Sequence, residues 1–430
     1  MEMKKIKQNI YLIISHKAFQ NFTIIGIIAI FQLINNVILG RHLEKEQFGQ
    51  YSFVFLNISG VLPIILLFGH NSSLLRYFSS KDFLKYQWKK YLLKSSSKII
   101  PLLIPLMLGI KIFYNLDWFW FWMGVISSFI MYFTNLISSL LRSKGYFLIT
   151  TLLERAHSII FSLLLSILVF YFNFFNIKTI SISKLISYSV AIPIILLMLF
   201  IWKEGTLKID KKIFKNNIAF WELNLSVIVL SSIDSFFIAK ILSFQELALF
   251  SITLTVLQLY EFARISLFHI YSQKFSQDNS INIIKFNRIL IIITISLFTF
   301  YMASTSFILN LLFHEKYTLT LSQLILFCLY SSINFLYLLP SCYVIGQSSN
   351  RDLRFMLGIN LSSIGIKIGL IMLLSGNGLS GFLLAGIIAQ LLRTSFGYHM
   401  IIKNKKIKWN MLFKLNIKYN IKLSQADDTI

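Results

Sequence analysis

Acidic residues are scarce in this sequence, and charge of either sign is low. The 430 residues include 17 aspartates and glutamates, and only 13% are Asp, Glu, Lys or Arg. A soluble domain carries about 25% charged residues, because its surface must face water. Hydrophobic residues make up 56% of the chain, and the mean hydropathy is +0.70. These values exclude a soluble globular protein and indicate a chain that crosses a membrane many times.

Features that most enzymes need are also missing. The two cysteines, Cys328 and Cys342, lie in one apolar segment, which predicts buried free thiols and no disulfide framework. Loops between apolar segments stay below about 20 residues, too short for a soluble catalytic domain. The sequence has no convergent carboxylates, no His/Cys metal set and no Gly-rich phosphate loop. It therefore predicts a protein that is not an enzyme and has no cofactor.

Apolar runs long enough to span a bilayer recur along the whole chain. A spanning helix needs about 17–25 residues, or a few more when it is tilted. Twelve runs meet this length: 18–40, 52–75, 91–113, 117–141, 147–175, 180–202, 217–241, 246–270, 288–312, 318–345, 354–374 and 379–402. The first run is longer than the core of a signal peptide, so it is interpreted as a retained span. The predicted fold class is an all-α integral membrane protein with about twelve transmembrane helices.

The basic residues lie mainly on one side of this predicted topology. Of 41 lysines and arginines, 29 fall in the segments that an even number of spans places with the termini, seven fall on the other side, and five lie inside spans. Lys184 is counted among the seven. The positive-inside rule then places both termini in the cytoplasm. The same rule accounts for most of the net charge of +24, so no nucleic-acid partner is predicted. The predicted partner of the basic surface is the phospholipid membrane.

Two short stretches repeat each other at a fixed offset. EQFGQYS at 46–52 is echoed by QELALFS at 245–251, and a shift of 199 residues also places Asn35 on Asp234 and Arg41 on Lys240. The offset equates the first span with the seventh, so we predict a duplicated unit of six spans running in parallel. The predicted domains are an N-terminal six-helix bundle at 1–203, a C-terminal six-helix bundle at 204–402 and a basic cytoplasmic tail at 403–430.

The repeated stretches carry a resemblance to a known family. Arg41-x-Leu43, followed by Phe48-Gly49-x-Tyr51-Ser52, resembles the opening of Wzx-type polysaccharide (O-antigen) flippases, members of the multidrug/oligosaccharidyl-lipid/polysaccharide (MOP) exporter superfamily. Asp234 and 247–251 are similar to the matching part of the second half, although Ala replaces Gly and Phe replaces Tyr there. The stretches NLLFHEKYTLTLSQLILFCLYSSINFLY, IGQSSNRDLRFMLGIN and NGLSGFLLAGIIAQLLR within 310–402 are similar as well.

This resemblance implies a function that the composition does not. Such a protein moves an undecaprenyl-diphosphate-linked oligosaccharide from the cytoplasmic to the periplasmic leaflet of the bacterial inner membrane, as in lipopolysaccharide assembly. The implied fold, shared with MATE transporters, is two six-helix bundles around a cationic central cavity. A polysaccharide polymerase or chain-length machinery is the implied protein partner.

Charges inside the predicted spans are candidate site residues. A charge at the bilayer centre costs about 2.5–3.5 kcal/mol on insertion scales, so it usually faces a cavity or a partner. The candidates for binding an anionic substrate are Arg142, Arg155, Arg264, Lys367 and Arg393, and the candidates for coupling or gating are Asp234 and Asn35. For Arg142 and Arg264, snorkelling to the inner interface is an alternative. Asp234 has two open roles, which are pairing with Lys367 and holding a coupling cation.

Two other functions remain open at this stage. An ion-coupled multidrug or small-molecule antiporter of the same superfamily would require acidic groups for cationic substrates, whereas the span charges here are mostly basic. A membrane-embedded polysaccharide polymerase would require a large outer loop. The driving force is also open: H⁺ or Na⁺ could be coupled, but export of about two negative charges gains roughly 4–5 kcal/mol per 100 mV from the membrane potential alone.

Overall fold

The computed structural model of the protein is all-helical. It describes residues 17–67, 69–70, 74, 78, 83–173, 175–209, 212–257, 264, 267–268, 271, 275, 283–347 and 350–405. Within these ranges there is no strand, and an isolated bridge between Tyr86 and Leu207 is the only β-type pairing. Helices satisfy their own backbone hydrogen bonds, as a chain in hydrocarbon must. The predicted all-α membrane class is confirmed. The predicted tail at 403–430 lies outside the described residues after Lys405.

The first set of helices covers the predicted N-terminal bundle. Its elements are α2 (Lys17–His42), α3 (Lys45–Ser52), η1 (Phe53–Ile58), α4 (Ser59–Leu66), η2 (Phe83–Lys85), α6 (Trp88–Tyr114), α7 (Trp118–Ser143), α8 (Phe147–Arg155), α9 (His157–Ser166), η3 (Ile167–Tyr171), α10 (Ile177–Ser189) and α11 (Ala191–Ile201). The segments η1 and η3 are single turns of π-helix, which continue their neighbours.

The second set covers the predicted C-terminal bundle. Its elements are α12 (Lys212–Phe237), η4 (Ile238–Leu242), α13 (Phe244–Leu257), α15 (Ile283–Phe313), α16 (Leu321–Leu336), α17 (Leu338–Gln347), α18 (Asn350–Leu374), η6 (Ser375–Asn377) and α19 (Gly378–Lys405). All twelve predicted ranges overlap helices of the two sets. By length and composition, seven described helical segments can cross a membrane, or eight if the bent pair α8–α9 is one span. The count of twelve crossings stays a prediction.

Apolar side chains cover the outside of the molecule as well as its core. On α11, Phe200 is 84% exposed and Leu197 is 60% exposed, while Phe48, Phe161 and Phe327 are fully buried. In water such an outer surface would promote association, whereas in hydrocarbon it carries no penalty. The chain is therefore a multi-pass membrane protein whose exposed apolar faces meet lipid.

Several helices end or break at residues that explain the change of direction. α6 and α15 both end before a residue with positive φ, Asn115 (52°) and His314 (49°), and these two residues are 199 positions apart. α8 and α9 meet at Ala156 with a bend of 42°. α10 and α11 break at Val190, shortly before Pro193. All five prolines lie within helices.

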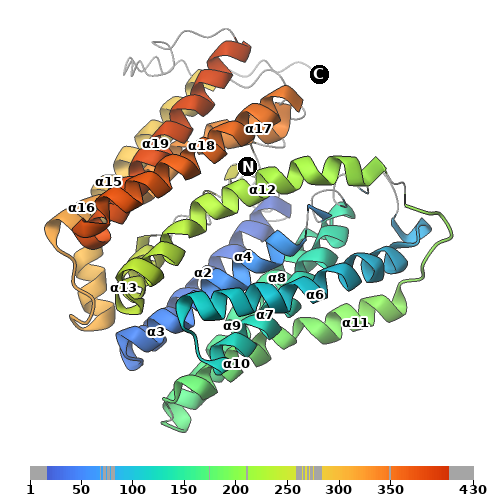
Figure 1. Ribbon diagram of the computed structural model, residues 1–430, viewed down its shortest axis with the longest axis horizontal. Helices are drawn as coiled ribbons and strands as arrows, with labels where there is room; N and C mark the ends of the chain where they lie inside the picture. Colours follow the sequence, from blue (N-terminus) through green and yellow to red (C-terminus); the bar gives the residue numbers. More distant parts are fainter. Residues whose placement is uncertain are drawn as a thin grey trace, which may run out of the picture.

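The helices pack in two groups that meet along a seam (Figure 1). In the first group α7 packs on α4, α6, α8, α10 and α11, and α2 packs on α8 and α9. In the second, α19 packs on α16 and α18, and α12 packs on α18. Across the seam α3 packs on α13, α12 on α4, and α15 on α2. The division into two six-helix bundles with a boundary at 203/204 remains a prediction.

The two repeated stretches face each other at the seam. α3 carries the first and α13 the second, and they pack closely because Gly49 has no side chain. A Cβ added at Gly49 would lie 1.9 Å from the carbonyl oxygen of Phe244, which is backbone and cannot rotate away. Glycine at this position therefore sets the distance between the two helices.

Replacing Gly49 with alanine should lower the stability of the protein. The new methyl group would force α3 and α13 apart, and overpacking of this kind costs about 1–3 kcal/mol. Thermal unfolding of the purified protein in detergent measures the effect. Gly60→Ala is the matched control, because nothing lies within 4 Å of a Cβ at Gly60 in α4. Equal melting temperatures for Gly49→Ala and Gly60→Ala would contradict the close contact.

Candidate functional site

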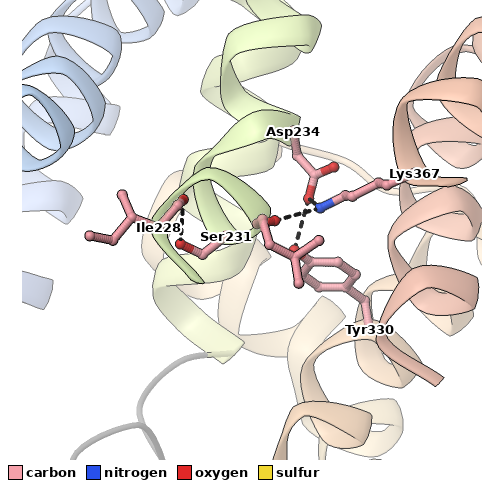
Figure 2. A network of polar contacts seen from close by, with 6 residues as sticks. Ile228, Ser231, Asp234, Tyr330 and Lys367 are labelled. Carbon is pink, nitrogen blue, oxygen red and sulfur yellow. Dashed lines mark hydrogen bonds and ion pairs between the residues drawn. The ribbon is translucent and has the colours of Figure 1, made fainter. Parts of the chain in front are cut away.

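Asp234 and Lys367 form a buried ion pair between α12 and α18. The Lys367 Nζ lies 2.7 Å from Asp234 Oδ2 and also donates to the carbonyl of Leu230 at 2.9 Å. The Tyr330 hydroxyl of α16 donates to the same Asp234 oxygen at 2.8 Å. Figure 2 shows the three side chains converging on one carboxylate. Of the two roles that the sequence left open for Asp234, pairing with Lys367 is what the structure contains.

The Asp234–Lys367 pair is buried, and one carboxylate oxygen lacks a hydrogen bond among the described residues. The side chains of Lys367 and Asp234 are 3% and 2% exposed. Asp234 Oδ1 has no hydrogen-bond partner among the described residues. Asn35, at the equivalent position in the first half, is buried too, but it donates to the carbonyl of Ser158 at 2.9 Å and accepts from Ser162 Oγ at 2.7 Å. At the two equivalent positions, the Asn35 amide is hydrogen-bonded and the Asp234 carboxylate is paired with a lysine.

Arg393 is held inside the second group of helices. It projects from α19, its Nε donates to Asn360 Oδ1 of α18 at 2.9 Å, and Asn360 donates to Ser226 Oγ of α12 at 2.9 Å. Its guanidinium lies 3.8 Å from the centre of the Tyr337 ring. Arg264 is half-buried and close enough for its charge to act on Arg393. These two predicted residues are therefore brought together.

The predicted cations of the first group behave differently from each other. Arg142, at the end of α7, is exposed and forms an ion pair with Glu154 of α8 at 2.5 Å. Arg155 follows Glu154 at the end of α8, is half-buried, and has no hydrogen-bond or ion-pair partner among the described residues. The structure thus ties Arg142 directly to the Glu154 carboxylate, whereas Glu154 acts on Arg155 only through its charge.

Lys184 is a buried cation that sequence reasoning missed. The charge count placed it outside the spans, but it lies in α10 and is 5% exposed. Its Nζ lies 3.5 Å from His157 Nδ1 and over the rings of Phe161 and Tyr188, at 4.6 and 5.1 Å. One sequence signal could have identified Lys184 as buried: it lies seven residues after the start of an apolar helix. Asn176 caps the start of this helix by accepting a hydrogen bond from the Lys178 amide.

Cations also connect the two groups at the ends predicted to face outward. Arg41, at the end of α2, donates through Nε to the carbonyl of Leu312 and through Nη2 to that of Leu311 at 3.0 Å. Lys240 of η4 donates to the carbonyl of Phe113 in α6 at 2.5 Å. Arg41 and Lys240 are 199 positions apart, and so are Phe113 and Leu312. Each group thus caps the same helix end of the other.

Lys316 reinforces the contact at Arg41. Its Nζ donates to the carbonyls of Arg41, at 3.3 Å, and of Leu43. Partial burial lowers the pKa of Lys316, and the nearby Lys45 lowers it further, while Glu44 opposes both. Cations at the C-terminal ends of helices are favourable because the last carbonyls lack helical partners.

Comparison with solved structures places this fold. The chain is similar to the inward-facing conformation of a multidrug resistance MATE family transporter of the MOP superfamily, with a TM-score of 0.66 and 13% identity over 88% of this chain and 96% of that one. It is also similar to the MATE multidrug transporter DinF-BH (TM-score 0.63, 14% identity, 92% and 95% covered). An outward-facing MATE transporter of the MOP superfamily gives 0.61 at 14% identity, with 91% and 96% covered.

No protein-family model matches the sequence, and no curated protein matches it. At 13–14% identity the structural likeness shows the fold alone. The chain therefore has the fold of MATE transporters of the MOP superfamily.

Proposed function

We propose that the protein is a membrane transporter that flips an undecaprenyl-diphosphate-linked oligosaccharide from the cytoplasmic to the periplasmic leaflet by alternating access. The observation that carries the proposal is the balance of buried charge. Among the described residues the buried charged side chains are Lys184, Asp234, Lys367 and Arg393, and the one carboxylate of this set is already paired with Lys367. The interior is therefore cationic, and it suits an anionic substrate.

Arginine chemistry supports a diphosphate as the charged group. The planar guanidinium matches phosphate oxygens with two parallel hydrogen bonds. In this proposal Arg155 of the first group and Arg264 with Arg393 of the second group act from the two sides of a central cavity. Arg142 is expected to contribute less, because Glu154 neutralises it. The membrane potential then favours outward movement of the negative charge.

A multidrug antiporter is the second candidate, and the comparisons favour it. The three similar solved structures are of MATE transporters, and all three are described as multidrug transporters or multidrug resistance proteins. A cationic drug or coupling ion would need an acidic group, and Asp234 Oδ1, which has no hydrogen-bond partner among the described residues, could supply it. Pairing with Lys367 opposes this use of Asp234, since a second cation would have to compete with the ammonium.

Two strains separate these functions. Expression in cells that lack their own O-antigen flippase should restore surface polysaccharide, and expression in cells that lack their drug exporters should leave drug sensitivity unchanged. Restored drug resistance without surface polysaccharide would overturn the flippase proposal in favour of the antiporter. A further strain set with different polysaccharide repeat units controls for substrate preference among flippases.

Alternating access requires contacts at the outer ends that can release. The caps of Arg41 on α15 and of Lys240 on α6 are suited to this, because each is an exposed cation on bare carbonyls. Such hydrogen bonds contribute about 0.5–1.5 kcal/mol each. We propose that the pair holds the outer ends closed in the conformation described here.

Removing both caps should open the outer seam more often. In Arg41→Ala/Lys240→Ala, a cysteine at the buried Ser52 position of α3 should react about tenfold faster with a membrane-impermeant maleimide, from the summed loss of the two contacts. Lys178→Ala, which removes an exposed cation from the same predicted side, should leave the rate unchanged. A rate equal to that of the parent in the double variant would contradict the closing role.

A further inference from the structure

The first group of helices buries a lysine without a carboxylate. Lys184 of α10 contacts His157 Nδ1 at 3.5 Å and the rings of Phe161 and Tyr188. His157 is the first residue of α9, and its ring packs edge-on against that of Tyr188 at 4.4 Å. No carboxylate of the described chain forms an ion pair with Lys184, and Glu154 is bound to Arg142. This arrangement differs from Lys367, whose ammonium meets Asp234.

The remaining groups around Lys184 are neutral or basic. Arg155 of α8 is close enough for its charge to act on His157, and Tyr51 of α3 interacts electrostatically with Tyr188. The Tyr188 hydroxyl donates to the carbonyl of Phe55 at 3.3 Å. From α7 and α11, the residues that approach this region are the uncharged Met131, Thr134, Ala191 and Ile194. Two positive charges 3.5 Å apart in such surroundings repel strongly, so Lys184 and His157 together carry no more than one.

A cavity connects this pair to the breaks of two helices. It has a volume of about 20 Å³ and is lined by Ala156 and His157 at the α8–α9 bend and by Val190 and Ala191 at the α10–α11 break, with further residues of α7. His157 lines the cavity, whereas Lys184 does not. An anion in the cavity would therefore not reach the ammonium, but a proton could pass through the imidazole. This favours a proton over an anion as the ligand.

We propose that Lys184 and His157 form a binding site for one proton that controls the hinge between α8–α9 and α10–α11. When the proton is bound, the Lys184 ammonium donates to His157 Nδ1 and is held over the Phe161 and Tyr188 rings, which fastens α10 to α9. When it leaves through His157, the amine is neutral and both ring contacts weaken. The break at Val190 is then released, and the two helix pairs move relative to each other.

This inference rests on the proposed transport function only where it links the movement of the helix pairs to transport. The proton site itself is defined without a substrate. It also differs from coupling through Asp234, which lies in the other group of helices. The N-terminal half would respond to protons, and the C-terminal half would keep its fixed Asp234–Lys367 pair.

Spin-label distances test the site without any substrate. Labels are placed on the full chain at Leu148 of α8 and Leu196 of α11, both exposed, in a background in which Cys328 and Cys342 are replaced with alanine. Between about pH 5.5 and about pH 9, the ratio of two distance populations should change by up to about tenfold per pH unit, which is the slope for one proton. Lys184→Met and His157→Gln should each remove the pH dependence.

Lys178→Met is the matched control, because it makes the same change at an exposed position of the same helix and should keep the pH dependence. Distances that do not change with pH in the parent protein, or that change as much in Lys184→Met and His157→Gln as in the parent, would overturn the proposal. A change that follows added chloride or phosphate at constant pH would instead assign the site to an anion. If flippase complementation fails while the pH-dependent distances persist, the transport proposal alone is wrong.

Discussion

Lys367→Met is expected to destabilise the protein by about 3–5 kcal/mol, which is the cost of leaving a buried charge without its partner. Asp234 would keep only the Tyr330 hydroxyl, because the ammonium at 2.7 Å is its one cationic partner among the described residues. Methionine fills a similar volume, so the loss reflects charge and not a cavity. The midpoint of thermal unfolding in detergent measures the effect, together with the yield of folded protein.

The double variant Lys367→Met/Asp234→Asn isolates the electrostatic part. Removing both charges leaves no uncompensated ion, so the double variant should recover most of the stability that the single variant loses. Asp234→Asn alone leaves the Lys367 ammonium with the Leu230 carbonyl and should be intermediate. A double variant as unstable as Lys367→Met would contradict a dominant role for the ion pair.

Arg155→Ala and Arg393→Ala are each expected to abolish complementation in the flippase-deficient strain while the protein still inserts into the membrane. Arg155 has no ion-pair partner in the described chain, so its loss should act on the substrate and leave stability nearly unchanged. Arg393 also supports Asn360 and the Tyr337 ring, so its loss should lower stability as well. Complementation, scored beside the amount of folded protein, separates these effects.

Charge and geometry can be separated at Arg155. Arg155→Lys keeps the positive charge but loses the planar fork, so it should complement only weakly if a diphosphate is bound. Arg142→Ala is the matched control one helix away, because its guanidinium is occupied by Glu154 and its loss should matter least. Full complementation by both Arg155→Ala and Arg393→Ala would exclude the proposed cationic binding site.

The sequence predicted the membrane fold well because hydrophobic length is a strong signal. Every predicted span overlaps a described helix, and the count of twelve crossings stays a prediction because seven or eight described helical segments are long and apolar enough to cross a membrane. The breaks at Ala156 and Val190 were not predicted. The break at Ala156 has no glycine or proline beside it, so no local pattern reveals it, whereas Pro193 lies three residues after Val190 and disrupts the helical hydrogen bonding there.

The candidate site was predicted in part. Asp234 and Lys367 could be paired from their similar distances to the outer ends of their spans, since depth in the membrane follows from residue number. Lys184 was assigned to the wrong environment, because the charge count treats a lysine near the start of a span as a loop residue. The pairing of Arg142 with Glu154 depends on how α7 turns into α8, and the gathering of Arg264 and Arg393 depends on tertiary packing.

A flipping assay in proteoliposomes tests the central claim most directly. The purified full-length protein is reconstituted with a fluorescent polyprenyl-diphosphate-linked sugar, and a membrane-impermeant quencher reports how much lipid reaches the other leaflet. We predict transfer of the diphosphate-linked lipid, faster with a potential that is positive on the receiving side, and no transfer of a neutral polyprenyl-linked sugar. Equal transfer of both lipids, or transfer of neither with uptake of a cationic dye, would contradict an anionic lipid-linked substrate.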